Sequence, residues 1–444
     1  MTHHDDRDPR EFDTIGNTRP TGSNYIADDP SDDGIDRRGF LRCMAWAGTA
    51  AVWGLSGGVP KSFALSRLPF LSDSERKSIF FAQISDSHIG FSKEANKDVT
   101  ATLQEAVGRL NALPQRPAFV LHTGDITQLA KPSEFDTANE VLKGIRTDRV
   151  LYVPGEHDVA GDNGASYLQR YGKGTNGGGW YSFDHSGVHF VGLVNVLNLK
   201  AGGLGSLGAE QLAWLAKDVA RLSNSTPIVL FAHVPLWTVY PEWGWGTDDS
   251  EQALALLKRF GSVTVLNGHI HQIMQKVEGH MSFHTAMSTA FPQPAPGTAP
   301  APGPMTVDAQ RLKSVLGITE VTFVPGRSAL AVVDATISGL PPAFAAASQD
   351  AMANRRRATR ALGANEIGID NFNFTPRTLA VKAGTKVTWI NDDDVPHLIV
   401  SVTGAFKPSP VLDTGQRFTA VVRAGVQRYF CSLHPMMQGQ VVAT

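Results

Sequence analysis

Five short groups of acidic residues and histidines are spaced so that they could hold metal ions. They are Asp86-Ser87-His88, Gly124-Asp125, Gly155-Glu156-His157-Asp158, Ala232-His233 and Gly268-His269-Ile270-His271. Carboxylate oxygen together with imidazole nitrogen suits manganese, iron or zinc, and the absence of thiolates argues against a structural zinc site. Asp86 and His88 are two residues apart, as are His269 and His271, so in extended backbone each pair would point to one face. The glycines that precede Asp125, Glu156 and His269 would allow tight turns. Together these groups predict a metal site.

A second set of metal-binding residue types lies near the C-terminus. Cys431-Ser432-Leu433-His434-Pro435-Met436-Met437 places a thiol, an imidazole and two thioethers in one short segment, and His397 precedes the cysteine by 34 residues. Two imidazoles, one thiolate and a weak thioether are the ligand set of blue copper. The segment therefore predicts a mononuclear copper site.

The segment from Ser78 to about Ser338 alternates short apolar runs with helical patterns. The apolar runs predict buried strands. They are Ile79 to Ile84, Ala118 to His122, Val150 to Val153, Val188 to Val194, Ile228 to His233 and Val263 to Leu266. Apolar residues at helical spacing predict helices over Ala101 to Leu113, Glu134 to Ile145, Ala209 to Leu222 and Glu251 to Phe260. The pattern predicts a layered α/β domain, and the metal-site groups fall at the C-terminal ends of its strands.

The rest of the chain divides by composition. Residues 339–365 contain paired prolines and three consecutive arginines and read as a linker, while 366–444 show the short alternating strands of a small all-β sandwich. Residues 1–36 carry ten acidic residues against three arginines, which predicts a disordered tail.

Residues 37–64 have the order of an export signal. Arg37-Arg38 is followed by an apolar stretch from Cys43 to Leu55 and by Ser62-Phe63-Ala64. This order resembles a twin-arginine signal, and the apolar stretch is too short to span a membrane. An N-terminal amphipathic helix is the alternative. The export interpretation implies contact with the twin-arginine export machinery, a periplasmic or secreted protein without a transmembrane anchor, and loss of Cys43, which would leave Cys431 as the one cysteine.

Composition excludes some functions. The chain has 444 residues and a formal net charge of -2, so a general basic field for binding nucleic acid is not indicated. Two cysteines cannot form a disulfide framework.

The five metal-site groups resemble those of the calcineurin-like metallophosphoesterases, with spacing closest to the cyclic-nucleotide-phosphodiesterase-like branch. This resemblance implies a four-layer sandwich of two sheets between helices, spanning residues 65–338. It also implies a binuclear site for two transition or divalent metal ions. Asp86, His88 and His271 would hold one metal, Asp125 would bridge, and Glu156, His233 and His269 would hold the other.

The resemblance also implies a hydrolytic mechanism, with one departure from the family at Glu156. His157 would contact the phosphate or protonate the leaving group, and Asp158 would orient the His157 ring. Glu156 stands where the family has asparagine, and its extra negative charge would strengthen metal binding but weaken Lewis acidity. Gln128 occupies the place of the tyrosine ligand of purple acid phosphatases, which disfavours that branch.

Residues 366–444 resemble small cupredoxins of the amicyanin and plastocyanin type. The resemblance rests on Asn371-Phe372-Asn373-Phe374-Thr375-Pro376, on Val387-Thr388-Trp389-Ile390-Asn391 and on the cysteine segment. It implies that His397, Cys431 and His434 are strong copper ligands, with Met437 axial and Met436 its nearest rival.

The two resemblances together predict an exported phosphoesterase that hydrolyses a phosphodiester or phosphomonoester and carries a blue-copper domain. That domain would need a redox partner if it transfers electrons. One alternative is a copper-binding or electron-transfer protein on a weakly active or inactive phosphoesterase scaffold. Another is a copper domain that acts as a regulator or lid of the hydrolase.

Overall fold

The computed structural model describes residues 51–56, 59–64, 78–197, 199–323, 330–339 and 361–444. The predicted acidic tail lies outside these residues, as does most of the predicted linker. Part of the predicted export signal is described as two antiparallel strands, β1 (Ala51–Ser56) and β2 (Val59–Ala64). The signal therefore stays a prediction. Among the described residues, no helix has the length and apolar character needed to cross a bilayer.

A five-stranded sheet carries the first three metal-site groups. Its order is β13 (Ala331–Thr336), β12 (Gly317–Phe323), β3 (Ile79–Ile84), β4 (Val120–His122) and β5 (Val150–Tyr152). Strands β3, β4 and β5 are parallel, whereas β12 pairs antiparallel with both β3 and β13. The carboxyl ends of the three parallel strands therefore meet at one edge.

A six-stranded sheet carries the other two groups. Its order is β10 (Gln275–Glu278), β11 (Met281–Thr285), β9 (Val263–Asn267), β8 (Ile228–Ala232), β7 (Val188–Gly192) and β6 (Tyr181–His185). Strands β7, β8, β9 and β11 run parallel to one another. All six strands predicted for this domain occur, with ends that shift by up to two residues.

The two sheets stack on an apolar core, and helices cover their outer faces. Aromatic residues of both sheets meet in the core, where the Phe81 ring is 5.0 Å from Phe119 and 5.3 Å from Phe190. The four predicted helices occur as α2 (Val99–Asn111), α3 (Pro132–Leu142), α5 (Gly208–Val219) and α6 (Ser250–Leu257). Buried residues of α2 and α3, such as Leu103 and Phe135, join one core cluster, and those of α5 and α6, such as Leu215 and Leu257, join another. The predicted four-layer α/β sandwich is confirmed. Shorter helices α4 (Ala165–Tyr171) and α7 (Ala309–Leu312) complete the domain.

The C-terminal domain is a sandwich of two four-stranded sheets. One has the order β15 (Asn373–Thr375), β14 (Glu366–Asp370), β17 (Lys386–Asn391), β19 (Arg417–Val421), and the other β16 (Thr378–Val381), β21 (Gln438–Ala443), β20 (Gly425–Cys431), β18 (Ile399–Ser401). Trp389 and Tyr429 are fully buried between them, with ring centroids 5.2 Å apart. The predicted all-β sandwich is confirmed.

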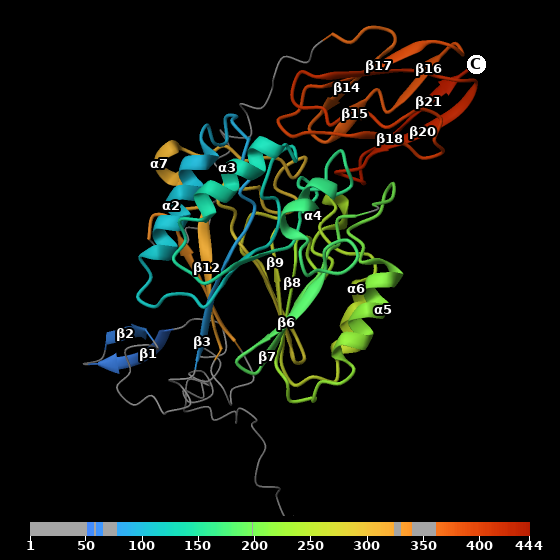
Figure 1. Cartoon of the computed structure of the whole chain (residues 1–444). Coiled ribbons are helices and arrows are strands. Elements are labelled where there is room, and N and C mark those ends of the chain that lie inside the picture. Colours follow the sequence, from blue (N-terminus) through green and yellow to red (C-terminus); the bar gives the residue numbers. More distant parts are fainter. Residues whose placement is uncertain (1–50, 57–58, 65–77, 198, 324–329, 340–360) are drawn as a thin grey trace, which may run out of the picture.

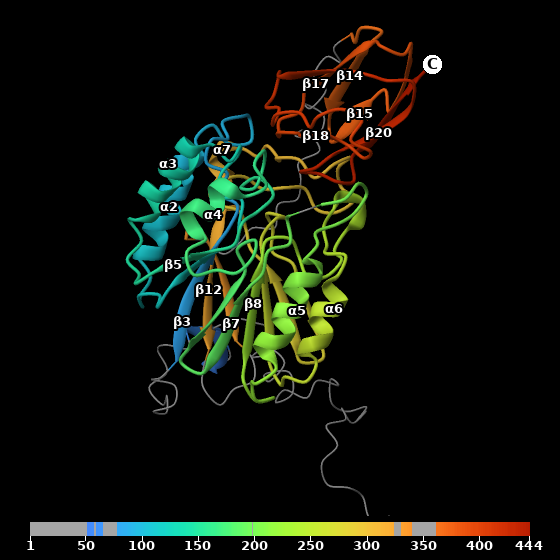
Figure 2. The ribbon, with the colours of Figure 1, turned by 45° about the vertical axis from the view of Figure 1, so that its right-hand side comes forward.

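The β-sandwich sits at one end of the α/β domain, and the β1–β2 pair lies at the other end (Figure 1). A view turned by 45° shows the same arrangement (Figure 2). The sandwich therefore lies over the end at which the α/β domain carries its metal-site groups.

Candidate metal centres

The five predicted groups converge at the carboxyl ends of parallel strands. Asp86 and His88 follow β3, Asp125 follows β4, Glu156 follows β5, His233 follows β8, and His269 and His271 follow β9. Both sheets end at this edge, so residues up to 185 positions apart become neighbours. The seven predicted binuclear ligands all belong to compact donor groups.

The local backbone differs from the extended form expected for the two-apart pairs. Asp86, His88, Asp125, His269 and His271 all have positive φ angles, between 43° and 72°. The extended-backbone explanation for the pairs is therefore wrong. Non-glycine residues in this region cost on the order of 1 kcal/mol or more each, and such strain persists where surrounding contacts impose it. The convergence of the side chains depends on these tight turns.

Two glycines permit the close approach of the strands' ends. Gly124 has φ 97°, and a Cβ there would lie 2.5 Å from Nδ1 of His233. A Cβ on Gly155 would lie 2.0 Å from Oδ1 of Asp125. Any larger residue at either position would displace a predicted ligand.

The first donor group consists of Asp86, His88 and His271, all buried. Nε2 of His271 is 3.3 Å from Oδ1 of Asp86 and 3.2 Å from Nε2 of His88. Asp125 lies beside this group, with its Oδ2 3.5 Å from Nε2 of His88. Three donors thus converge on a space that one ion could fill, with Asp125 beside them.

The second donor group consists of Glu156, His233 and His269. The two carboxylate oxygens of Glu156 lie 3.0 Å from Nε2 of His233 and 3.0 Å from Nδ1 of His269. Oδ2 of Asp125 is also 3.4 Å from Nε2 of His233. Asp125 is therefore the carboxylate that lies between the two groups.

These donors fit metal ions because backbone groups hold the outward-facing nitrogens of His233 and His271, while the inward-facing atoms have one another as their nearest polar neighbours. Backbone carbonyls of Thr123 and Phe291 accept from Nδ1 of His233 and His271, at 2.7 and 2.6 Å, which leaves each Nε2 free to coordinate. Among the described residues, three buried atoms of the second group make no hydrogen bond: Oε2 of Glu156, Nε2 of His233 and Nδ1 of His269. These atoms lie 3.0 Å from carboxylate or imidazole neighbours but without hydrogen-bond geometry, and coordination to a shared ion would satisfy them.

Gln128 is a positioning residue whose role the sequence did not reveal. Its side-chain Oε1 lies 2.9 Å from Nδ1 of His88, and its backbone carbonyl lies 2.9 Å from Nδ1 of His157. The sequence singled out Gln128 only as a position without a ligating tyrosine. One feature of the sequence could have indicated this role: Gln128 lies four residues after Gly124, in the same turn as Asp125.

Asp158 does not orient the His157 ring, so that prediction is wrong. Its carboxylate accepts hydrogen bonds from the backbone amides of Gly155, Ile126 and Thr127, at 2.9–3.1 Å. Asp158 instead ties the turn after β5 to the turn after β4. Burial and the nearby charge of Asp125 raise the pKa of Asp158 to about 7. The backbone carbonyl of Gln128 orients the His157 ring instead.

His157 lies against the first donor group. Its ring centroid is 4.7 Å from that of His88, and it forms a compact group with His88 and Asp125. Burial would lower the pKa of His157, but the carboxylates of Asp125 and Glu156 outweigh it and raise the pKa. A protonated imidazole here can donate to an anion.

The predicted copper ligands also converge. Sγ of Cys431 is 3.5 Å from Nδ1 of His397 and 3.6 Å from Nδ1 of His434, and the two nitrogens are 3.3 Å apart. One ion about 2 Å from each donor could contact all three. Met437 is buried and its amide donates to the carbonyl of His434, whereas Met436 is half-buried, with its Cγ 3.8 Å from a Cβ built on Gly244 of the α/β domain.

Charge around the thiol fits a bound cation. Burial would raise the pKa of Cys431, but hydrogen bonding to His397 and its charge lower the pKa. Asp393, which the sequence analysis did not single out, lies with Oδ2 3.2 Å from Nε2 of His397 and leaves Nδ1 facing the thiol. Burial keeps the pKa of His434 well below its ordinary value, so its nitrogen lone pair is available.

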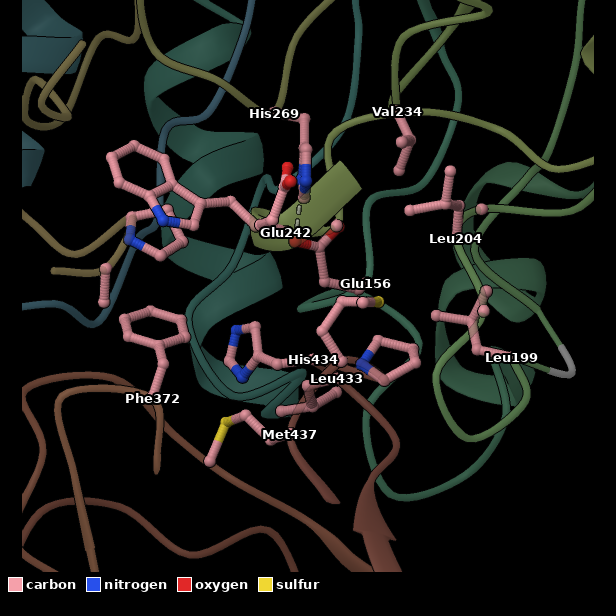
Figure 3. Close-up of a pocket in the computed structure, with 18 of the residues that line it drawn as sticks. Glu156, Leu199, Leu204, Val234, Glu242, His269, Phe372, Leu433, His434 and Met437 are labelled. Atoms are coloured by element: carbon pink, nitrogen blue, oxygen red, sulfur yellow. Dashed lines mark ion pairs between the residues drawn. The ribbon is translucent and has the colours of Figure 1, made fainter. Parts of the chain in front are cut away.

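The two metal-site regions face each other. The ring centroids of His157 and His434 are 6.2 Å apart. A pocket between them is lined by Glu156 and His269 on one side and by Phe372 and His434 on the other (Figure 3). The copper ligands and the binuclear ligands are therefore parts of one region.

Histidines outside the motifs have mostly structural partners. His189 contacts Asp184 and Asp218, and His284 contacts Asp334 and Gln275. His284 therefore does not join the donor groups. His122 is closer to them, since its Nε2 lies 2.8 Å from Oγ of Ser87.

Comparison with known proteins matches both domains. The profile of the calcineurin-like phosphoesterases matches residues 81–273, and that of the cupredoxin-like domain matches residues 342–443. The glycerophosphodiester phosphodiesterase GpdQ of Enterobacter lignolyticus is 27% identical over 209 residues, covering 44% of this chain and 72% of its own. Amicyanin-alpha of Methylorubrum extorquens is 34% identical over 85 residues, covering 18% of this chain and 71% of its own.

The chain carries a calcineurin-like phosphoesterase domain and, at its C-terminus, a domain of the cupredoxin family. A probable GpdQ of Arcobacter nitrofigilis is a further relative of the phosphoesterase domain, 26% identical over 222 residues and covering 46% of this chain and 77% of its own. The phosphoesterase family implies divalent or transition metals, and the cupredoxin family implies copper.

Proposed function

We propose that this protein hydrolyses phosphodiesters at a binuclear metal site. The observation that carries the proposal is the pair of compact donor groups on either side of Asp125, one with Asp86, His88 and His271 and one with Glu156, His233 and His269. Manganese, iron or zinc suit this mixture of carboxylates and imidazoles. Two such ions, when bound, supply an activated hydroxide and neutralise charge on the phosphate.

The protein's own residues would bind the phosphate and move a proton. The Gln128 carbonyl holds Nδ1 of His157, which leaves its Nε2 to donate to a phosphate oxygen or to the departing alcohol. Asp158 fixes the turns that carry Asp125 and His157 through its bonds to backbone amides.

A diester suits this site better than a monoester. Glu156 adds a carboxylate beside the phosphate position, and repulsion from it is weaker for a singly charged diester than for a dianionic monoester. The E. lignolyticus relative is a glycerophosphodiester phosphodiesterase, which agrees with this choice.

The test is an assay of the purified full chain with bis(4-nitrophenyl) phosphate and 4-nitrophenyl phosphate, alongside measured metal content. We expect turnover of the diester to exceed that of the monoester, and Asp125→Asn to abolish both activities. Full metal occupancy without diester turnover would refute the proposal.

A copper-binding or electron-transfer protein is the second candidate. The buried Cys431, His397 and His434 group favours copper whether or not the phosphoesterase domain is active. We expect a blue absorption band on loading with Cu(II), and its loss in Cys431→Ser. If copper binds without that band, the blue-copper assignment is wrong.

We further propose that residues 37–64 direct export by the twin-arginine route to the periplasm or the outside of the cell. The mature protein would then comprise the phosphoesterase domain, residues 65–338, the linker and the cupredoxin domain, residues 366–444. N-terminal sequencing of protein recovered from the periplasm would test this, with a start near Leu65 expected.

A further inference from the structure

A cavity lies between the two domains where their metal-site regions meet. Its volume is about 160 Å³, close to the roughly 150 Å³ that holds one benzene ring. Figure 3 shows Glu156 and His269 facing Phe372, Leu433 and His434 across this space. The cavity thus begins at the second donor group and ends at the cupredoxin domain.

Both domains contribute apolar side chains to the cavity walls, beside polar residues such as Asn371 and Asn373. The cupredoxin domain contributes Phe372, Leu433 and Met436, and the phosphoesterase domain contributes Leu204, Val234 and Trp243 among others. The Phe372 ring centroid is 4.7 Å from that of His434, so this aromatic side chain forms part of the wall beside the copper ligand.

The charged groups of the cavity are acidic. Glu156 and Glu242 line it, and among the described lining residues there is no lysine or arginine. A second anionic group on a ligand, held away from the metal-ligating side chains Glu156, His269 and His434, would therefore meet no lysine or arginine, and burying it unpaired is costly.

Contacts between the domains hold the cupredoxin wall in place. The Gly202 amide donates to the Pro435 carbonyl at 2.6 Å, and Nζ of Lys93 lies 3.7 Å from Oδ1 of Asp413. The Gly202–Pro435 hydrogen bond fixes the copper-ligand segment, which contains His434 and Met436. The Lys93–Asp413 ion pair connects the domains at another part of the interface.

We propose that this cavity receives the alcohol that leaves from the phosphodiester, and that Phe372 and Met436 of the cupredoxin domain select an uncharged, ring-sized leaving group. This inference rests on the proposed hydrolysis, in which water gives OH to phosphorus and the P–O bond to the alcohol breaks. The departing oxygen takes a proton, and the donor proposed above, His157, has its ring centroid 6.2 Å from that of His434, which lines the cavity.

The charge selection is tested with two diesters that differ by one carboxylate, methyl 4-nitrophenyl phosphate and methyl 3-carboxy-4-nitrophenyl phosphate. For the full chain we expect kcat/KM to be about tenfold or more lower for the carboxylated diester, because its charge is buried without a partner. Met436→Lys should narrow this ratio severalfold, and Met436→Gln, which is similar in size and neutral, should not. Equal kcat/KM values, or a ratio unchanged by Met436→Lys, would overturn the inference.

A binding measurement separates this inference from the proposed function. Calorimetric titration with the non-hydrolysable methyl 4-nitrobenzylphosphonate should give a Kd about five- to tenfold weaker for Phe372→Ala, because an aromatic contact is lost. Phe418→Ala is the matched control, since Phe418 is a half-buried phenylalanine that packs on Trp389 of the cupredoxin core. The inference would be overturned if phosphonate affinity fell equally in both variants or fell in neither. Normal phosphonate binding with a Phe372 effect but without diester hydrolysis would refute the proposed function, while the cavity would still be a binding site for an uncharged ring.

Discussion

His157 of the phosphoesterase domain and His434 of the cupredoxin domain face each other with ring centroids 6.2 Å apart. One imidazole belongs to a predicted phosphate-binding site and the other to a predicted copper site. Because these residues lie close together, the two domains contribute to one region and are not independent modules on a linker. A ligand between them would contact both domains.

Gln128→Ala should weaken metal binding at the first donor group. The Gln128 side chain orients His88 through its Nδ1, and loss of such an outer contact typically lowers metal affinity about 10- to 100-fold. Competition with a chelator would measure the affinity. Gln275→Ala is the control, because Gln275 makes a similar contact to the His284 ring outside the donor groups. Equal metal affinity in the two variants would contradict the positioning role.

Glu156→Asn should weaken metal binding and raise hydrolysis. The Glu156 carboxylate lies 3.0 Å from donor nitrogens of both His233 and His269, so an amide there removes a negative charge from the site. We expect kcat for the diester to rise about tenfold at saturating metal, since the ions become stronger Lewis acids. Steady-state kinetics at several metal concentrations would measure both the weaker metal binding and the higher kcat. A fall in kcat with full occupancy would mean that the carboxylate assists the reaction.

Met437→Ala should change the copper spectrum, while Met436→Ala should leave it nearly unchanged. Met437 is buried, whereas Met436 is half-buried, with its Cγ 3.8 Å from a Cβ built on Gly244 of the other domain. The axial thioether tunes a blue-copper site, so its removal shifts the absorption bands and the reduction potential. The reverse pattern would assign Met436 as the axial ligand.

His189→Gln should destabilise the protein most at low pH. Burial alone would lower the pKa of His189, but hydrogen bonds and charges of Asp218 and Asp184 outweigh it and raise the pKa. The stabilisation is therefore fully present below the ordinary histidine pKa of about 6.5. It is lost as pH rises through the raised value. Asp184 is largely exposed, so we expect a loss of only about 1 kcal/mol at pH 5.

Urea unfolding followed at pH 5 and pH 9 would measure this difference. His185→Gln is the neighbouring control, because the His185 ring lies against Phe119 instead of between two carboxylates. A His189→Gln effect that is the same at both pH values would show that the stabilisation does not depend on the histidine's charge.

The metal-site residues could be predicted because chemistry limits which residues do this work, and strand ends bring them together. Asp86, Asp125 and His233 each follow an apolar run that is recognisable in the sequence. The roles of Gln128 and Asp393 could not be predicted, because a single amide or carboxylate acquires its partner only through the tertiary fold.

Other features of the fold also depended on long-range contacts. Strand β12 joins β3 only after more than 200 intervening residues, and its sequence Gly317–Phe323 carries no motif that requires this pairing. The left-handed backbone at His269 and His271 was missed because the same two-residue spacing fits an extended strand. The cavity between the domains has no counterpart in any local pattern, since it forms where Phe372 and Glu156 approach from separate domains.

The most direct test of the central claim is a stoichiometric titration of the metal-free full chain with Mn(II), followed by turnover of bis(4-nitrophenyl) phosphate. The two donor groups on either side of Asp125 predict that activity rises to a plateau at two equivalents of metal per chain. Asp125→Asn should lose that activity and still show the blue band with Cu(II). Two tightly bound equivalents without diester turnover would contradict the claim.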